Sequence, residues 1–326
     1  MCSRWARGHY AAVQDGETVL LPNPHWWQEY KAAVTVESIT LVETDSPAAI
    51  RDDFEYGATG VVCTDPSSSA YADYHCDYEL WNCSTPIMDF IGFNTTSGMF
   101  SDAGLRAAFT YLVDRQTIAT DVYKGYAEAA VLPCNPLSSL YDTALAAEYD
   151  YAPEKFKAAL QTDGALGSAK FLVCSSDPGR LQAAQVIADE AAKYGLELKI
   201  DAQPSDKFTY MVYQGDYDLY YGQVKLSPNF DLSNFFNGSS LGNGGITSEA
   251  MLKLCKDALG NSGNYYSLHE TILKNGMLCP VLFKAYAVYA TRGIITNMVP
   301  AVDNVFHTSN GRSITDALPV PEQTGG

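Results

Sequence analysis

The chain has 326 residues, of which 47% are hydrophobic and 18% charged, and its 38 acidic against 21 basic residues give a net charge of −17. This length is enough for about two domains, and the composition is that of a folded protein with a substantial core. The negative charge would repel phosphate backbones and anionic lipid headgroups, so nucleic acid is excluded as a partner.

The chain start and the apolar segments bear on targeting. No apolar stretch reaches the roughly 20 residues that a membrane helix needs, and the first residues lack the apolar region of a secretory signal. We therefore expect an N-terminus that is mature, truncated or engineered.

Strands are expected early in the chain at residues 18–21, 38–42 and 60–63. Asn23 and Pro24 mark a turn after the first of them. Ser46 and Pro47 predict the start of a helix, with serine as its cap and proline in its first turn, and Gly57 predicts its end.

A long apolar segment then ends at residues 92–94 and leads through a polar loop into two expected helices. Ser101 and Asp102 are placed as the cap and the first-turn carboxylate of the first helix. Asp114-Arg115 interrupts its apolar stripe, and a second, shorter helix ends at Gly125. The stripe recurs at helical spacing and consists of Leu105, Ala108, Phe109 and Leu112.

The middle of the chain predicts a right-handed βαβ unit. Residues 170–174 form its first strand, Asp177-Pro178 opens its helix, Gly195 ends that helix, and residues 196–200 alternate as its second strand. Further expected elements are a helix from residue 205, a buried strand at 217–221, a loop at 237–245, helices at 248–259 and 265–275, a long strand at 279–289 and a flexible tail from residue 319.

Tyrosine is frequent, and five tyrosines lie close together in the sequence. Such rings could line a sugar or peptide groove, or they could be core residues. Alternation along the expected strand sends Tyr217 and Tyr221 to one face and Tyr220 to the other, so only some of them can face a ligand.

Eight cysteines are spread over the chain without a C-x-x-C pair, which does not fit a zinc site. A disulfide between Cys76 and Cys83, with Cys63 as a competitor, is one alternative. Free and buried thiols are the other, and the one that we favour. The cysteines are Cys2, Cys63, Cys76, Cys83, Cys134, Cys174, Cys255 and Cys279.

Taken in order, several segments resemble the extracytoplasmic solute-binding proteins that serve peptide and nickel ABC transporters. The similar segments are NPHWW, GFN followed by FSDAGLRAAFTYLVDRQTI, YAPEKFKAAL, GDYDLYYG and DLSNFF. Each is a weak match alone, but together they cover roughly residues 18–310 in the order of the family.

The resemblance implies an α/β fold of the two-lobed periplasmic-binding-protein type (type II, peptide-binding subclass), with one lobe complete and the other partial. We expect residues 1–91 in lobe I, without its N-terminal part, 92–288 in lobe II, and 289–326 in a return to lobe I and a flexible tail. The expected hinge residues are Phe93, Asn94 and Tyr286.

Ligands in open α/β sheets bind beyond the carboxyl ends of parallel strands, which points to the loops after 170–174 and after 217–221. The second loop mixes a cation, a carboxylate, amides and an aromatic ring, as small-ligand pockets do. An ordinary solvated connection is the alternative for each residue. The candidate ligand-binding residues are Ser175, Ser176, Gln223, Lys225, Asn229 and Asp231.

Peptide-binding relatives carry in this second loop an aspartate, a few residues after Gly-Trp, that pairs with the α-amino group of the ligand. Here Gln223 replaces the tryptophan, Lys225 and Pro228 lie near the place of the aspartate, and Asp231 matches a later element. This departure argues against capture of a free amino terminus. Lys225 favours an anionic group, unless it is simply a surface lysine of an acidic protein.

The five histidines lack HxH and HExxH spacing, and there is no G-x-S-x-G, P-loop or G-x-G-x-x-G motif. We therefore expect no catalytic residue, no metal and no cofactor.

The expected function is that of a substrate-binding component of an ABC importer. It would capture a peptide-like or anionic small solute between two lobes and deliver it to permease subunits. It would act as an extracytoplasmic monomer, periplasmic or lipid-anchored at the cell surface, and without the missing segment it would bind weakly or not at all. Two alternatives stay open: an α/β hydrolase or transferase with Asp231 and Lys225 as catalytic groups, and a ligand-sensing ectodomain.

Overall fold

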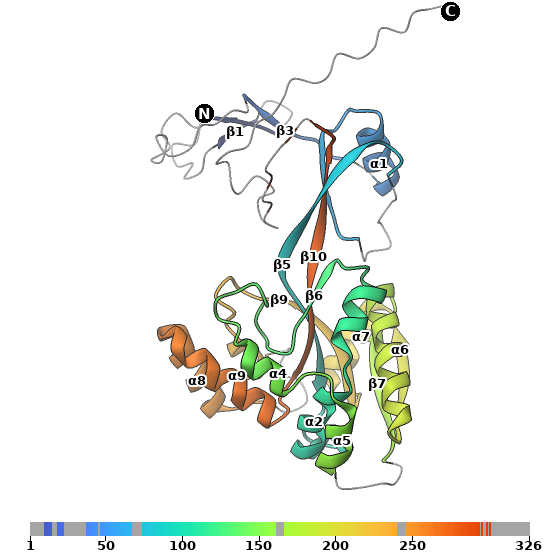
Figure 1. The fold of residues 1–326 in the computed structure, drawn as a ribbon, viewed down its shortest axis with the longest axis vertical. Coiled ribbons are helices and arrows are strands. Elements are labelled where there is room, and N and C mark those ends of the chain that lie inside the picture. Colours follow the sequence, from blue (N-terminus) through green and yellow to red (C-terminus); the bar gives the residue numbers. More distant parts are fainter. Residues whose placement is uncertain are drawn as a thin grey trace, which may run out of the picture. The chain divides into compact units, whose positions relative to one another are not determined.

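The computed structural model describes residues 10–14, 18–22, 37–44, 46–66, 74–160, 166–239, 246–293, 295, 298 and 300. The chain divides into two compact units (Figure 1). The division falls at Cys83–Ser84 within strand β5 (Tyr78–Phe93) and at Ala285–Tyr286 within strand β10 (Cys279–Thr291). We call the part from Ser84 to Ala285 unit 2 and the described residues outside it unit 1. The lobe boundaries at 91 and 288 lie elsewhere in these strands and stay a prediction.

Unit 1 contains a three-stranded antiparallel sheet and a short helix. The sheet consists of β1 (Tyr10–Gln14), β2 (Thr18–Pro22) and β3 (Ile39–Leu41). Helix α1 (Pro47–Glu55) begins as expected, because Ser46 Oγ accepts a hydrogen bond from Ala49 N at 3.2 Å. Strand β4 (Val61–Thr64) pairs antiparallel with β10. The turn at Asn23 and the tail from Pro319 lie outside the described residues.

Unit 2 is built on a mixed sheet with strand order β10-β5-β9-β7-β8, and short β6 (Ala127–Ala129) pairs with β10. Strands β7 (Gly167–Cys174) and β8 (Leu196–Gln203) are parallel along their full lengths, and helix α6 (Pro178–Lys193) connects them. The predicted βαβ unit is thus confirmed. Asp177 caps α6 by accepting from Arg180 N at 3.1 Å, and the chain turns at Gly195 with a φ of +82°.

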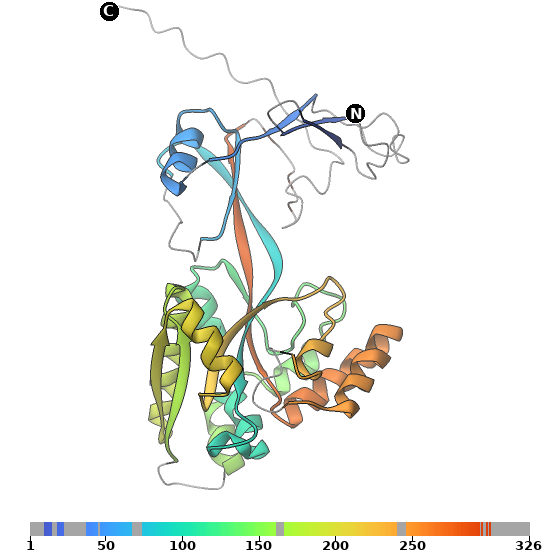
Figure 2. The same cartoon turned by 180° about the vertical axis from the view of Figure 1, so that it is seen from behind.

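Helices cover both faces of this sheet (Figures 1 and 2). Helices α2 (Ala103–Phe109), α5 (Pro153–Leu160) and α6 pack on the face that carries Phe171 and Tyr221. Helices α7 (Ser205–Gln214), α8 (Glu249–Gly260) and α9 (Tyr265–Lys274) pack on the face that carries Leu172 and Tyr220. Tyr217 packs with Tyr220, so the prediction that it lies on the same face as Tyr221 was wrong. The reason is that β9 (Leu219–Lys225) begins only after Tyr217, so strand alternation does not apply to it.

The two helices expected after residue 100 are broken into short pieces. Asp102, not Ser101, is the cap of α2, and it accepts from Leu105 N at 2.8 Å. Further elements are η2 (Met99–Ser101), η3 (Thr110–Leu112), α3 (Arg115–Thr117), η4 (Ile118–Val122), α4 (Thr143–Glu148), η5 (Ser233–Phe235) and η7 (Ser262–Asn264).

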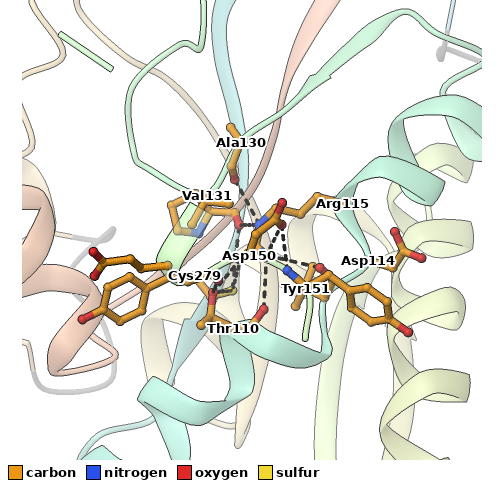
Figure 3. A network of polar contacts seen from close by, with 12 residues as sticks. Thr110, Asp114, Arg115, Ala130, Val131, Asp150, Tyr151 and Cys279 are labelled. Atoms are coloured by element: carbon orange, nitrogen blue, oxygen red, sulfur yellow. Dashed lines mark hydrogen bonds and ion pairs between the residues drawn. The ribbon is translucent and has the colours of Figure 1, made fainter. Parts of the chain in front are cut away.

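Arg115 lies inside the core, although in the sequence it interrupts an apolar stripe. Its side chain is 1% exposed and donates to the carbonyl oxygens of Thr110, Val113, Ala130 and Pro280 at 2.9–3.2 Å. It also contacts Thr110 Oγ1 and Cys279 Sγ (Figure 3). One guanidinium therefore holds together the segments around η3, β6 and β10.

No disulfide joins any two of the seven cysteines in the described residues, so the alternative bridge between Cys76 and Cys83 is not formed. Five of the seven are buried, while Cys63 is exposed and Cys76 half-buried. Cys2 lies outside the described residues. Most of these thiols thus serve as small core side chains.

Gly92 and Tyr220 are cross-strand partners in the β5–β9 pair. A Cβ on Gly92 would overlap the Tyr220 ring, which is 3% exposed and packs against Phe90 at 5.8 Å. Gly92→Ala is therefore expected to lower the free energy of unfolding by about 1–3 kcal/mol through overpacking, measured by urea denaturation. Combined with Tyr220→Leu, it should cost less than the sum of the two single changes. Additive losses would show that this contact is not the cause.

Candidate functional site

The carboxyl ends of β7 and β9 form an opening in the sheet of unit 2. The two strands are parallel but pair only at Phe171–Leu219 and Leu172–Tyr220, and beyond these pairs they separate. Helix α6 leaves β7 on one face, whereas α7 precedes β9 on the other. Such a position, where neighbouring connections go to opposite faces, is where open α/β sheets bind ligands.

A pocket of about 470 Å³ lies beside β9 and is lined by residues of β5, α6, α7 and β9, five of them aromatic. We call it the aromatic pocket. Its polar members are Arg180, Asp206 and Gln223, together with Thr209. Its remaining lining residues are Phe90, Phe208, Tyr210, Val212, Tyr213, Tyr220 and Gly222. Rings with a few placed polar groups are the usual composition of a small-molecule site.

A second pocket, of about 450 Å³, follows along the chain, and we call it the loop pocket. Its charged members are Lys225, which is exposed at the end of β9, and Asp231. Its other lining residues are Val224, Leu226, Ser227, Pro228, Asn234 and Phe235.

The structure brings some of the predicted ligand-binding residues to these pockets and leaves others apart. Gln223 lines the aromatic pocket, and Lys225 and Asp231 line the loop pocket. Ser175 and Ser176 are exposed after β7 and line neither pocket.

Two predicted residues take part in local loop structure. Asn229 Oδ1 accepts from Ser227 Oγ at 2.6 Å, and its carbonyl accepts from the Tyr265 hydroxyl. Asp231 Oδ1 accepts from Ser233 N at 2.9 Å and from Ser233 Oγ at 2.6 Å. These contacts give the Asp231 carboxylate a structural role at the start of η5.

The predicted hinge residues lie at different distances from the division between the units. Tyr286 is next to it, on β10. Phe93 is fully buried in unit 2 and stacks on Phe100 at 5.2 Å. Asn94 Nδ2 donates to the carbonyls of Gly215 and Tyr217 at 3.2 and 3.1 Å, which ties the end of β5 to the α7–β9 turn.

Arg180 is a candidate that sequence reasoning missed. Its side chain is 14% exposed, its Nε donates to Asp177 Oδ2 at 2.9 Å, and it reaches the aromatic pocket from the first turn of α6. Burial lowers its pKa, but the charges of Asp177 and Asp89 outweigh burial and raise it overall, so Arg180 stays cationic. Such a guanidinium can bind a carboxylate. The signal available was an arginine three residues after the cap of a helix that follows a parallel strand.

Asp89 is a second residue that sequence reasoning missed. It is fully buried on β5, accepts from the Tyr123 hydroxyl at 2.7 Å, and accepts from Gln223 Nε2 at 2.9 Å. Burial raises the pKa of Asp89, whereas the two hydrogen bonds and the charges of Lys284 and Arg180 oppose this rise. A lone aspartate in the apolar run PIMDFIGF was the available signal.

A model of the bacterial extracellular solute-binding proteins of family 5 (middle region) matches residues 10–245. The chain belongs to this family. Family 5 is a family of transport proteins, which accords with the α/β fold and with pockets at the end of parallel strands. No curated protein sequence matches the family 5 chain significantly.

Solved structures give the same fold assignment. The family 5 chain superposes with a TM-score of 0.76 on the ABC transporter substrate-binding protein CtaP from Listeria monocytogenes, at 14% identity, over 95% of this chain and 67% of that one. For a putative peptide-binding protein AppA from Clostridium difficile, the TM-score is 0.73 at 16% identity, over 94% of this chain and 67% of that one. For a nickel ABC transporter structure from Bacillus halodurans, the TM-score is 0.74 at 16% identity, over 94% of this chain and 69% of that one. These likenesses confirm the two-lobed binding-protein fold class, and the chain spans about two thirds of the length of these structures.

Two further observations concern the described residues of the family 5 chain. None of their helices has the length and hydrophobicity that a membrane span requires. Nor do they contain a group of three His, Cys, Asp or Glu side chains placed to hold a metal ion.

Proposed function

We propose that this chain is the substrate-binding component of an ABC importer and that it captures a peptide or another small solute for delivery to permease subunits. The observation that carries the proposal is the pocket between α7 and β9, which an arginine, an amide and several rings line. Membership of family 5 supports the same proposal. In our proposal the protein acts outside the cytoplasm as a monomer, either periplasmic or lipid-anchored.

The solute that fits this lining has an apolar or aromatic body and an anionic end. Arg180 would bind the anionic end, because its terminal nitrogens make no side-chain hydrogen bond within the described residues. Phe208 and Tyr220 would pack against the body of the solute. Lys225, at the neighbouring loop pocket, would extend the attraction for anions. A peptide with a free carboxyl terminus meets these requirements.

Arg180→Gln is expected to weaken binding of a phenylalanine-containing tripeptide with a free carboxylate about 10- to 100-fold. The reason is that a hydrogen bond to a charged group contributes about 1.5–3 kcal/mol. For the same tripeptide with an amidated C-terminus, Arg180→Gln should change the affinity little, because this peptide has no carboxylate for Arg180 to bind. Saturation-transfer NMR with the intact chain measures both peptides, and it detects weak binding.

Lys199→Gln is the matched control, since it removes the same charge from an exposed position on β8. It should leave both affinities nearly unchanged. An equal loss for the free and amidated peptides in Arg180→Gln, or a comparable loss in Lys199→Gln, would contradict the assignment of Arg180 to the anionic end.

A further inference from the structure

Gln223 connects the aromatic pocket to a buried carboxylate. It lines the pocket and is at the same time the cross-strand partner of Asp89 in the antiparallel β5–β9 pair. By strand alternation the two side chains lie on the face of the sheet that carries Ile91 and Tyr221, and Gln223 Nε2 donates to Asp89 Oδ1 at 2.9 Å. A residue that lines the pocket is therefore held by one that does not.

The carboxylate decides which atom of the amide faces it. An ionised carboxylate can only accept hydrogen bonds, and both bonds recorded for Asp89 arrive from donors, Gln223 Nε2 and the Tyr123 hydroxyl. Burial raises the pKa of Asp89, whereas its two hydrogen bonds and the charges of Lys284 and Arg180 act in the opposite direction. Because Nε2 is directed to Asp89, the amide oxygen of Gln223 is directed away from it, and in the described part of the chain Oε1 receives no side-chain hydrogen bond.

We propose that Asp89 is a positioning residue that fixes the Gln223 amide so that its oxygen is presented to the aromatic pocket, which thereby selects solutes with an N–H or O–H donor at that point. This proposal rests on the proposed function and deepens it by naming a specificity determinant. A solute that offers only an acceptor at the same point leaves Oε1 without a partner, and a site that holds an unpaired polar group discriminates against such a solute.

In Asp89→Asn, we expect the preference of the pocket for solutes with a hydrogen-bond donor to be inverted. The hydroxyl of Tyr123 would still donate to the side-chain oxygen of residue 89, so the new amide nitrogen would face Gln223. That nitrogen needs an acceptor, and Gln223 satisfies it by turning its amide through half a turn. The pocket would then present the Nε2 donor, and solutes with an acceptor would gain.

The test uses two neutral probes of matched size, N-acetylphenylalaninamide, whose terminus donates, and N-acetylphenylalanine methyl ester, whose terminus only accepts. Neutral probes are needed because loss of the Asp89 charge would by itself shift the balance between charged ones. By ligand-observed NMR titration of the intact chain, we expect the unsubstituted protein to prefer the amide about three- to tenfold, the size of one net hydrogen bond. Asp89→Asn should abolish or reverse this preference.

Two further variants separate positioning from simple damage to the fold. Tyr123→Phe removes the other hydrogen bond of the same carboxylate, yet it leaves an anion that still accepts from Gln223, so the preference should persist. Gln223→Leu removes the amide itself and should bring the ratio of the affinities for the amide and ester probes close to one. Far-ultraviolet circular dichroism establishes that each variant is folded.

A readout that needs no solute is the side-chain amide of Gln223 in ¹H–¹⁵N spectra. One of its protons should exchange slowly with water in the unsubstituted protein and in Tyr123→Phe, and quickly in Asp89→Asn. A fast-exchanging amide in the unsubstituted protein, or a probe ratio that Asp89→Asn leaves unchanged, overturns the positioning role alone. Binding of neither probe to a protein with the slow proton counts instead against the pocket as a solute site, and so against both its specificity and the proposed function.

Discussion

Replacing Arg115 with methionine is expected to lower the free energy of unfolding of unit 2 by about 3–5 kcal/mol, as the loss of one partner from a buried charged network does. Methionine fills most of the volume but donates no hydrogen bond. The carbonyls of Ala130 and Pro280, which now accept from Arg115 Nε at 3.2 and 2.9 Å, would remain buried without this donor. Urea denaturation followed by circular dichroism measures the loss.

Arg115→Lys keeps the positive charge but not the planar fork, so it should recover only part of this stability. Arg51→Met removes an arginine from an exposed pair with Asp52 and should leave the unfolding midpoint nearly unchanged. If Arg115→Lys were as stable as the unsubstituted protein, charge alone would account for the effect. The hydrogen-bond network of Figure 3 would then not be its cause.

Gly276→Ala is expected to lower the free energy of unfolding by about 2–5 kcal/mol, which combines left-handed backbone strain with overpacking. Gly276 has a φ of +54°, and a Cβ at this position would overlap Cβ of Arg106 and the backbone nitrogen of Ala107. The neighbours have no room to move, because Arg106 Nε donates to the Gly276 carbonyl at 2.9 Å and Nη2 donates to the Asn275 carbonyl at 3.1 Å. The turn after α9 is thus fixed against α2.

Gly215 provides the matched control for this prediction. Its φ is +70°, so alanine meets similar backbone strain, but no atom lies within 4 Å of a Cβ at this position. Gly215→Ala should therefore cost only about 1–2 kcal/mol. The difference between the two variants in thermal and urea unfolding measures the clash with α2, and equal losses would refute it.

The parts of the fold that follow from local rules were predictable from the sequence. The unit β7–α6–β8 is an example, since its strand alternation, the cap Asp177 and the stop at Gly195 all lie within the segment itself. Helix α1, with Ser46 before Pro47, is another. The fold class was then implied by the resemblance to the solute-binding proteins, whose segments occur in the same order along this chain.

Buried charges were not predictable, because their partners are far away in the sequence. Arg115 reads as a surface break in an apolar stripe, but its acceptor Pro280 lies 165 positions away. Asp89 is a lone carboxylate in an apolar run, and its partner Gln223 lies 134 positions away. A pattern of hydrophobicity carries no information on which distant polar groups will meet such a side chain.

The candidate site was predictable in location and only partly in detail. The rule on carboxyl ends of parallel strands led to Gln223, Lys225 and Asp231, which line the two pockets. The same rule led to Ser175 and Ser176, which are exposed instead. Their place is taken by Arg180, because its longer side chain reaches the aromatic pocket from the first turn of α6.

We propose that the pocket between α7 and β9 holds a small solute without altering it. The deciding experiment is a ¹H–¹⁵N NMR titration of the intact chain with a phenylalanine-containing tripeptide. We expect saturating shifts at Gln223, around Arg180 and along α7, while the spectrum of the peptide itself stays chemically unchanged throughout. Shifts that do not saturate or that lie elsewhere in unit 2, or the appearance of cleaved peptide, would contradict the account.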